Sequence, residues 1–245
     1  GNDVIRRLIE RMGNGVTKGE IESLVAGETV TKEIHEDLTY KQVYDSIDNL
    51  WSLLLATGYL TYRGKPDGKR YQLAIPNMEI RETFRGQIMA MFKEETAKDP
   101  EMLTAFCTAL KTGNEQEAQR LFTAYLEKSI SLRDTFVRKS LKENFYHVIL
   151  LGILGLKNGW YVKSNYETGD GYGDIVIHVE DEGIGIVIEV KYAQDGRLEE
   201  ACKEALRQIE KRGYGKELIQ DKDCHTLFRY GIGCYKKQCK VMIEK

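Results

Sequence analysis

Two short segments rich in valine and isoleucine decide the fold of this chain: Asp174-Ile-Val-Ile-His-Val179 and Ile184-Gly-Ile-Val-Ile-Glu-Val-Lys191. Between them lies Glu180-Asp181-Glu182-Gly183, whose composition is typical of a turn. Short β-branched segments on either side of a turn predict an antiparallel β-hairpin. If the two strands pair symmetrically about the turn, Val179 lies opposite Ile184.

This register places two acidic side chains opposite each other. Counted back from the turn, Asp174 pairs with Glu189, and Lys191, two residues further along, points to the same face. Like charges that face each other destabilise a sheet, and a divalent cation held between two carboxylates would compensate for their repulsion. Two other interpretations stay open: a structural ion pair between one carboxylate and Lys191, or a register that differs by one residue.

The elements around the hairpin predict a mixed sheet. One helix and one strand are expected before the hairpin, and one helix and two strands after it. This order predicts an α/β (α+β) fold in which helices flank a mixed sheet. The expected bounds are 141–156 and 198–212 for the helices, and 161–164, 227–235 and 238–243 for the strands.

A third carboxylate lies on the first of these helices. Glu143 and His147 are four residues apart and therefore share one face of the helix. Glu143 could join the two carboxylates of the hairpin, although an acidic residue on such a helix is usually just solvated. His147 is more typical of a packed or exposed helix histidine than of a metal ligand.

The N-terminal third has a different pattern. Residues 40–58 carry apolar side chains at spacings of three and four and predict a helix, while strands are expected at 59–62 and 70–75 around a turn at 63–69. Helices followed by a two-stranded ribbon resemble a winged helix, a fold that can place a helix in the DNA major groove. We favour packing against protein over DNA reading, because the predicted helix is largely apolar and carries two aspartates.

Residues 81–140 show further amphipathic stretches and predict a helical connector or bundle. The chain is therefore expected to divide into three parts. These are a winged-helix-like domain at 1–85, a helical connector at 86–138 and the mixed-sheet domain at 139–245.

Composition limits the classes of function. The chain has 245 residues, with 36 Lys and Arg against 38 Asp and Glu, a formal net charge of −2. This balance excludes nucleic-acid binding by bulk positive charge but leaves room for a local phosphate site. No segment approaches the roughly 20 apolar residues that span a bilayer, so no membrane is expected. The five cysteines contain no C-x-x-C pair, which favours free thiols in a cytoplasmic protein over a zinc site or a disulfide framework.

The hairpin residues resemble the motif of the PD-(D/E)XK nuclease superfamily. Gly173-Asp174 followed by Glu189-Val190-Lys191 fits an Asp on one strand and (Asp/Glu)-x-Lys on the next, with Gly173 in place of the proline. The literal Pro66-Asp67 pair lies in a predicted turn and has no Glu-x-Lys after it. The resemblance implies a restriction-endonuclease-like mixed sheet and phosphodiester hydrolysis in DNA or RNA that depends on Mg²⁺ or Mn²⁺.

The same resemblance implies a role for each residue of the site. Two carboxylates would bind the metal, a lysine would orient the nucleophile or neutralise phosphate charge, and a glutamine on the following helix would position the lysine or a water. Two further positions recur in the family without a clear role, Glu167 and Tyr214. The implied catalytic residues are Asp174, Glu189, Lys191, Glu143 and Gln208, and the implied metal ligands are Asp174, Glu189, Glu143 and the carbonyl of Val190.

A wider resemblance covers nearly the whole chain. Segments 53–60, 75–84, 143–147 and 163–167 are similar to bacterial and archaeal AAA-ATPase-like proteins that end in a PD-(D/E)XK domain. In that family an ATPase domain comes first, whereas this chain begins without Met and contains no G-x-x-x-x-G-K-[S/T] motif. We therefore expect the C-terminal part of a larger protein, with the ATPase domain as a partner.

Two functions follow as hypotheses. One is a metal-dependent nuclease that acts on nucleic acid. The alternative is a catalytically inactive nuclease-fold module that docks on the ATPase domain or on another protein, because a fold does not fix a function.

Overall fold

The computed structural model describes residues 46–129, 139–166, 172–213 and 224–244, together with shorter stretches before residue 46. Those stretches are positions 5, 20–21, 23–25, 27–35, 37 and 42. The chain divides into two compact units. The first comprises residues 1–91 and 131–137, and the second comprises residues 92–130 and 138–245. The three-part division expected from the sequence stays a prediction, and Glu167 and Tyr214 lie outside the described residues.

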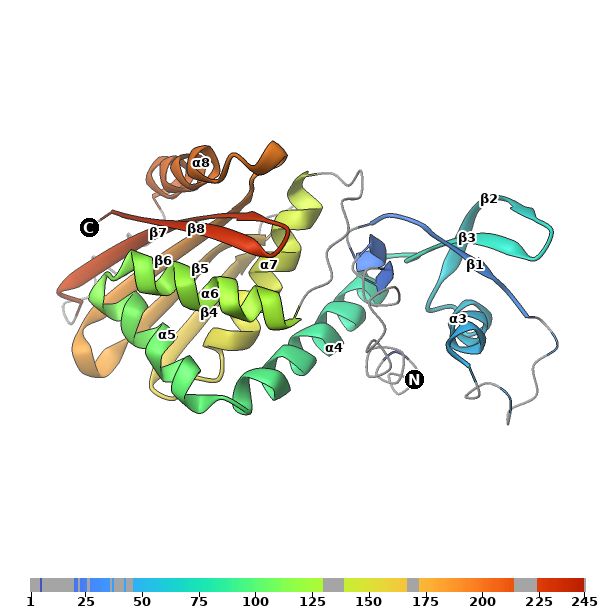
Figure 1. Cartoon of the computed structure of the whole chain (residues 1–245), viewed down its shortest axis with the longest axis horizontal. Helices are drawn as coiled ribbons and strands as arrows, with labels where there is room; N and C mark the ends of the chain where they lie inside the picture. The colour runs from blue at the N-terminus through green and yellow to red at the C-terminus, as the bar shows by residue number, and fades with distance from the viewer. Residues whose placement is uncertain are drawn as a thin grey trace. The chain divides into compact units, whose positions relative to one another are not determined.

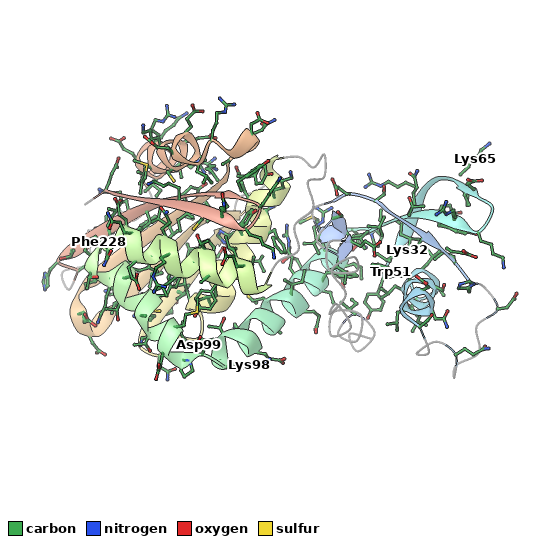
Figure 2. All side chains as sticks on the ribbon, viewed as in Figure 1. Lys32, Trp51, Lys65, Lys98, Asp99 and Phe228 are labelled. Atoms are coloured by element: carbon green, nitrogen blue, oxygen red, sulfur yellow. The ribbon has the colours of Figure 1, made fainter. Side chains whose placement is uncertain are left out.

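The first unit combines a helix with a small antiparallel sheet (Figure 1). Ser46 caps the helix by accepting a hydrogen bond from the Asn49 amide, and Lys32 lies over the Trp51 ring at 5.1 Å (Figure 2). The strand order is β1-β3-β2. The bounds are β1 Val30–Glu33, α3 Ile47–Ala56, β2 Thr61–Asp67 and β3 Arg70–Ala74.

The hairpin of this unit differs from its prediction. The turn expected at 63–69 is confined to residues 68–69, because β2 continues to Asp67. Pro66 is tolerated there because β2 is an edge strand, where the missing N–H of proline breaks no hydrogen bond of the ladder. The pairing of β2 with β3 is also irregular between Arg63 and Asp67. Strand β1 was not predicted. Whether this unit is a winged helix stays a prediction.

Three helices follow: α4 Met78–Ala97, α5 Pro100–Thr112 and α6 Glu115–Ser129. They confirm the helices predicted between residues 81 and 129, and residues 130–138 of the predicted helical region lie outside the described residues. Sequence explains the start and end of α5, because Asp99 accepts a hydrogen bond from the Met102 amide and Gly113 adopts the left-handed conformation after the last turn. The boundary between the two units falls inside α4.

The second unit is built on a five-stranded mixed sheet of the order β4-β5-β6-β7-β8 (Figure 1). Neighbouring strands are antiparallel except for β6 and β7, which are parallel and are connected through α8. The predicted fold class is confirmed. The bounds are α7 Lys139–Leu154, β4 Trp160–Tyr166, β5 Tyr172–Val179, η2 Glu180–Glu182, β6 Ile184–Tyr192, η3 Gln194–Gly196, α8 Leu198–Arg212, β7 Thr226–Tyr235 and β8 Gln238–Glu244.

Helices cover the two faces of this sheet unequally. Helix α8 packs on β6, β7 and β8, and it lies opposite α5 and α6 (Figure 1). Two glycines of β7 permit this approach, because a Cβ on Gly231 or Gly233 would lie 2.4 Å from a backbone oxygen of α8. On the other face, the hydroxyl of Tyr230 donates a hydrogen bond to the Leu110 carbonyl of α5 at 2.6 Å. Among the described residues, no helix has both the length and the apolar character needed to cross a bilayer.

Candidate active site

The β5–β6 hairpin brings two carboxylates together. Its strands pair with Val179 opposite Ile184, which confirms the predicted register and excludes a shift by one residue. The positions that follow the last pair of this ladder are Asp174 and Glu189, called the acid pair below. Opposed side chains of an antiparallel pair lie about 4.5–5.5 Å apart at Cβ, so the acid pair is in contact.

Apolar packing explains why the acid pair is buried. Two residues closer to the turn on each strand, Val176 and Val187 oppose each other and pack with Leu206 and Ile209 of α8. The acid pair lies on this same face of the sheet, because side chains two residues apart point the same way. Asp174 is fully buried and Glu189 is 3% exposed. Both carboxylates therefore lie where water does not solvate their charge.

Burial changes the acid–base chemistry of the pair. Burial raises the pKa of Asp174 to about 10, with the charge of the adjoining Glu189 acting in the same direction and the charge of Lys191 opposing them. Both carboxylate oxygens of Asp174 and Oε2 of Glu189 are buried without a hydrogen-bond partner in the protein. Two ionised carboxylates can only accept hydrogen bonds, so their contact requires either a shared proton or a bound cation.

Lys191 supplies the positive charge of the site. Its Nζ lies 2.6 Å from Oε1 of Glu189 and 3.5 Å from Oε2 of Glu143. Burial disfavours the ammonium, but the charges of Glu189 and Glu143 outweigh burial and raise the pKa of Lys191. The ion pair considered from the sequence is therefore present. It leaves the oxygens of Asp174 and Oε2 of Glu189 without partners.

Glu143 reaches the site from α7 and closes the end of the hairpin. Its Oε1 accepts a hydrogen bond from the Tyr192 amide at 3.1 Å, while Oε2 faces Lys191. The amide of the next residue, Ala193, donates a hydrogen bond to the carbonyl of Cys234 in β7. Because successive amides of a strand point to opposite edges, the Tyr192 amide points away from β7, beyond the last pair of the β5–β6 ladder. Glu143 thus satisfies a strand amide and fixes the lysine.

Glu143 is linked to the acid pair through Lys191, which contacts both Glu143 and Glu189. Among the described residues, no three Asp, Glu, His or Cys side chains are grouped as a metal site. A cation held by the acid pair would therefore need other oxygen ligands. The carbonyl of Val190 and the carboxylate of Glu143 stay predictions in that role.

Helix α8 contributes a residue that sequence reasoning missed. After burial and the charges of Glu189 and Glu143, the carboxylate of Glu204 also affects Lys191 and helps to raise its pKa. Glu204 is one helical turn before Gln208, so both lie on the same side of α8. Gln208 is half-buried, and its role against the site stays a prediction. Spacing of four from Gln208 was the sequence feature that could have identified Glu204.

His147 is not part of the site formed by the acid pair, Lys191 and Glu143. It is 3% exposed, and its Nε2 lies 2.8 Å from the hydroxyl of Ser164 in β4. This contact ties α7 to the edge of the sheet. A packed helix histidine, the more typical reading of the sequence, accounts for it.

The second unit contains the mixed sheet, the acid pair and Lys191. Residues 141–244 match the family model of the PD-(D/E)XK nuclease superfamily. The match covers the helix, the sheet and all the site residues expected from the sequence, and it says nothing of an ATPase family. No curated protein and no solved structure matches the chain.

The PD-(D/E)XK superfamily generally uses divalent metals, and the residues present fit such an ion. The buried oxygens of the acid pair without partners are hard ligands, which suit Mg²⁺ or Mn²⁺. A cation there would remove the repulsion between the two carboxylates and satisfy their lone pairs. The donor set therefore agrees with the metal that the superfamily implies.

Proposed function

We propose that the second unit is a metal-dependent phosphodiesterase that cleaves nucleic acid. The observation that carries this proposal is the acid pair, whose buried oxygens lack protein partners while Lys191 stands 2.6 Å from one of its carboxylates. Buried carboxylates without partners are costly to the fold, and such costs concentrate at functional sites.

Each residue has a distinct task in this proposal. The acid pair would hold Mg²⁺ or Mn²⁺, which when bound lowers the pKa of a water and offsets charge on the phosphate. Lys191 remains an ammonium, because its pKa is raised by Glu189 and Glu143 against the effect of burial. It can therefore donate hydrogen bonds to a phosphate oxygen or orient the attacking water. Glu143 positions Lys191 and does not touch the phosphate.

The phosphodiester hydrolysis that these groups would catalyse needs only water as a second reactant. The water oxygen bonds to phosphorus and the water gives up a proton, while one P–O ester bond breaks and the leaving oxygen gains a proton. Lys191 is placed to stabilise the negative charge that grows on phosphate oxygens as this happens.

A catalytically inactive module is the second candidate, and the Lys191–Glu189 ion pair favours it. A lysine that neutralises a carboxylate could serve the fold alone. This reading accounts for Oε1 of Glu189 but leaves both oxygens of Asp174 buried and without partners. We therefore rank it below the enzyme.

The test is cleavage of plasmid DNA and of RNA with Mg²⁺ or Mn²⁺, comparing the wild type with Asp174→Asn. Asn keeps the shape of the side chain but removes the charge that binds the metal. Lys203→Ala is the matched control, because Lys203 is exposed on α8 and paired with Glu199 at 2.6 Å. We expect a loss of at least about 100-fold for Asp174→Asn and none for the control. Cleavage that survives Asp174→Asn unchanged would contradict the assignment.

Titration with Mn²⁺ separates the two candidates independently of activity. The enzyme predicts heat of binding and a rise in Tm that Asp174→Asn abolishes, because a ligand that binds only the folded state stabilises it. The inactive module predicts neither.

We also propose that the chain is the C-terminal part of a larger AAA-ATPase-like protein and that its first unit docks on the ATPase domain. The support is the resemblance of the four segments named above. Sequencing the gene upstream of the Gly1 codon tests this. A motif G-x-x-x-x-G-K-[S/T] in the same reading frame is expected, and a start codon directly before Gly1 would overturn the proposal.

A further inference from the structure

The face of the sheet that holds the acid pair extends beyond it onto β4. In the β4–β5 ladder, Lys163 is opposite Val176 and Tyr161 is opposite His178. Val176 lies on the face of the acid pair, since it is two residues from Asp174. Tyr161 and Lys163, called the β4 strip below, therefore project from the same face of the sheet as Asp174.

Helix α8 does not cover this part of the face. It packs on β6, β7 and β8, whereas β4 is the outer strand on the far side of β5. Tyr161 is 56% exposed, the highest value among the large apolar side chains that the structure describes as exposed. Lys163 is exposed as well, and its Nζ lies 5.0 Å from the centroid of the Tyr161 ring. An aromatic ring and a cation thus form one surface unit beside the acid pair.

We propose that the β4 strip binds a single-stranded segment of nucleic acid and leads it to the acid pair. This inference rests on the proposed function and names the form of its substrate. Tyr161 stacks on a base and Lys163 contacts a phosphate.

The chemistry of the strip favours a single strand. Stacking on an exposed aromatic ring needs a base with a free face, which a continuous duplex does not offer. One lysine on a chain of net charge −2 provides little bulk attraction for the dense charge of a duplex. A strand that combines one stacked base with one phosphate contact fits this pair of side chains.

The spacing of the strip suits a strand that ends at the acid pair. Residues two apart in a strand are separated by about 6.7 Å, so Lys163 lies about that far from the level of Asp174, and Tyr161 about 13 Å. Lys163 would then hold a phosphate next to the one being cleaved, and Tyr161 would hold a base further along. All three groups lie on one side of the sheet.

The test measures binding without cleavage. Labelled oligothymidine and oligouridine of about twelve nucleotides are titrated with the whole chain in chelator, and a duplex of equal length forms a third arm. Tyr161→Ala is expected to weaken single-strand binding about tenfold, and Tyr161→Phe to leave it nearly unchanged because the ring is kept. The thymidine and uridine arms show whether DNA, RNA or both are bound.

Salt dependence tests the lysine. Lys163→Gln is expected to reduce the slope of log Kd against log salt by about 0.7, the effect of one lost phosphate contact on a single strand. Lys163→Arg should keep the slope, since its charge is kept. Lys203→Ala, an exposed lysine on α8, is the matched control and should change neither the slope nor the affinity.

The outcomes separate this inference from the proposed function. Cleavage by the wild type together with unchanged binding in Tyr161→Ala would overturn the β4 strip and leave the nuclease standing. Weakened single-strand binding in Tyr161→Ala, with no cleavage by the wild type, would support the strip and contradict the nuclease. Equal or tighter binding of the duplex through the same residues would overturn the choice of a single strand.

Discussion

Two of the antiparallel hairpins in the described part of the chain, β2–β3 and β5–β6, place similar charges in opposite environments. In the first unit, the β2–β3 hairpin with its turn carries five charged residues from Arg63 to Arg70, and all of them are exposed. Lys65 projects from this hairpin near its tip (Figure 2). In the second unit, β5 and β6 carry Asp174, Glu189 and Lys191, and all three are buried.

The difference shows why a motif must be read with its surroundings. Pro66-Asp67 spells the first letters of the PD-(D/E)XK motif, but Asp67 is an exposed aspartate on an edge strand. Asp174 follows a glycine instead of a proline, yet α8 and the neighbouring strands bury it against Glu189. Water weakens the interactions of an exposed charge. A buried charge interacts more strongly with its neighbours, which shifts its pKa or favours the binding of a cation.

The largest expected effect separates the lysines of the two hairpins. Lys191→Ala should reduce metal-dependent cleavage by at least about 100-fold, because it removes the one cation that faces the acid pair in the described site. Lys65→Ala should leave the rate of cleavage at the acid pair unchanged. The two variants are compared by their initial rates of cleavage of a short oligonucleotide at saturating concentration. Equal losses of activity in both would contradict the proposed difference between the two hairpins.

The next effect concerns the glycines of the two units. Gly231→Ala places a Cβ 2.4 Å from the carbonyl oxygen of Cys202 in α8, so the helix must shift, and a loss of about 3 kcal/mol or more in the free energy of unfolding is expected. Gly64→Ala in β2 meets no atom within 4 Å, but its φ of +73° disfavours alanine, and about 1 kcal/mol is expected. Urea unfolding measures both.

If Gly231→Ala lost no more stability than Gly64→Ala, close packing of α8 would not be what buries the acid pair. The comparison of the two hairpins would then need another cause for the difference in burial.

A smaller effect should appear in the pH dependence of stability without metal. The pKa of Asp174 is about 10 in the folded protein, raised by burial and then by Glu189, and 3.8 is its ordinary value. Between these values the folded state binds more protons than the unfolded state, so stability falls as pH rises from about 4 towards 10. Asp174→Asn lacks this loss and should be more stable than the wild type by roughly 1–3 kcal/mol at pH 8.

Urea unfolding in chelator at pH 4 and pH 8 checks the sign. The difference in stability should be much smaller at pH 4, where the folded carboxyl is protonated and the unfolded one, with its ordinary pKa of 3.8, is only partly ionised. Addition of Mn²⁺ at pH 8 should stabilise the wild type and reverse the order. A wild type that is more stable than Asp174→Asn at pH 8 in chelator would contradict the burial cost.

Sequence predicts the second unit better than the first, for a physical reason. The β5–β6 register follows from the turn and from apolar residues that must face a core, and a slip by one residue would expose them all. The β2–β3 hairpin has little core to fix it, so the extent of β2 depends on its place at an edge, which sequence does not reveal. Strand β1 is only four residues long and gave no periodic pattern.

The site divides in the same way. The acid pair and Lys191 could be located from strand register alone. The hydrogen bond from Tyr192 to Glu143 depends on where the β5–β6 ladder ends, and the charge of Glu204 near Lys191 depends on how α8 crosses the sheet. Both depend on tertiary structure: spacing places Glu204 on the same side of α8 as Gln208, but only the packing of α8 brings its charge near Lys191.

The smallest expected effect is that of Asp67→Asn on stability. Asp67 is exposed at the end of β2, opposite Arg70 in the ladder, and a surface pair of this kind contributes little because water already solvates both charges. The free energy of unfolding at pH 8 should change by less than about 0.5 kcal/mol, against the gain of roughly 1–3 kcal/mol for Asp174→Asn under the same conditions. Equal changes in the two variants would mean that burial does not distinguish the hairpins. A near-zero change at Asp67 beside a clear gain at Asp174 would assign the cost to burial of the charge, since the same substitution is made on a hairpin strand in both cases.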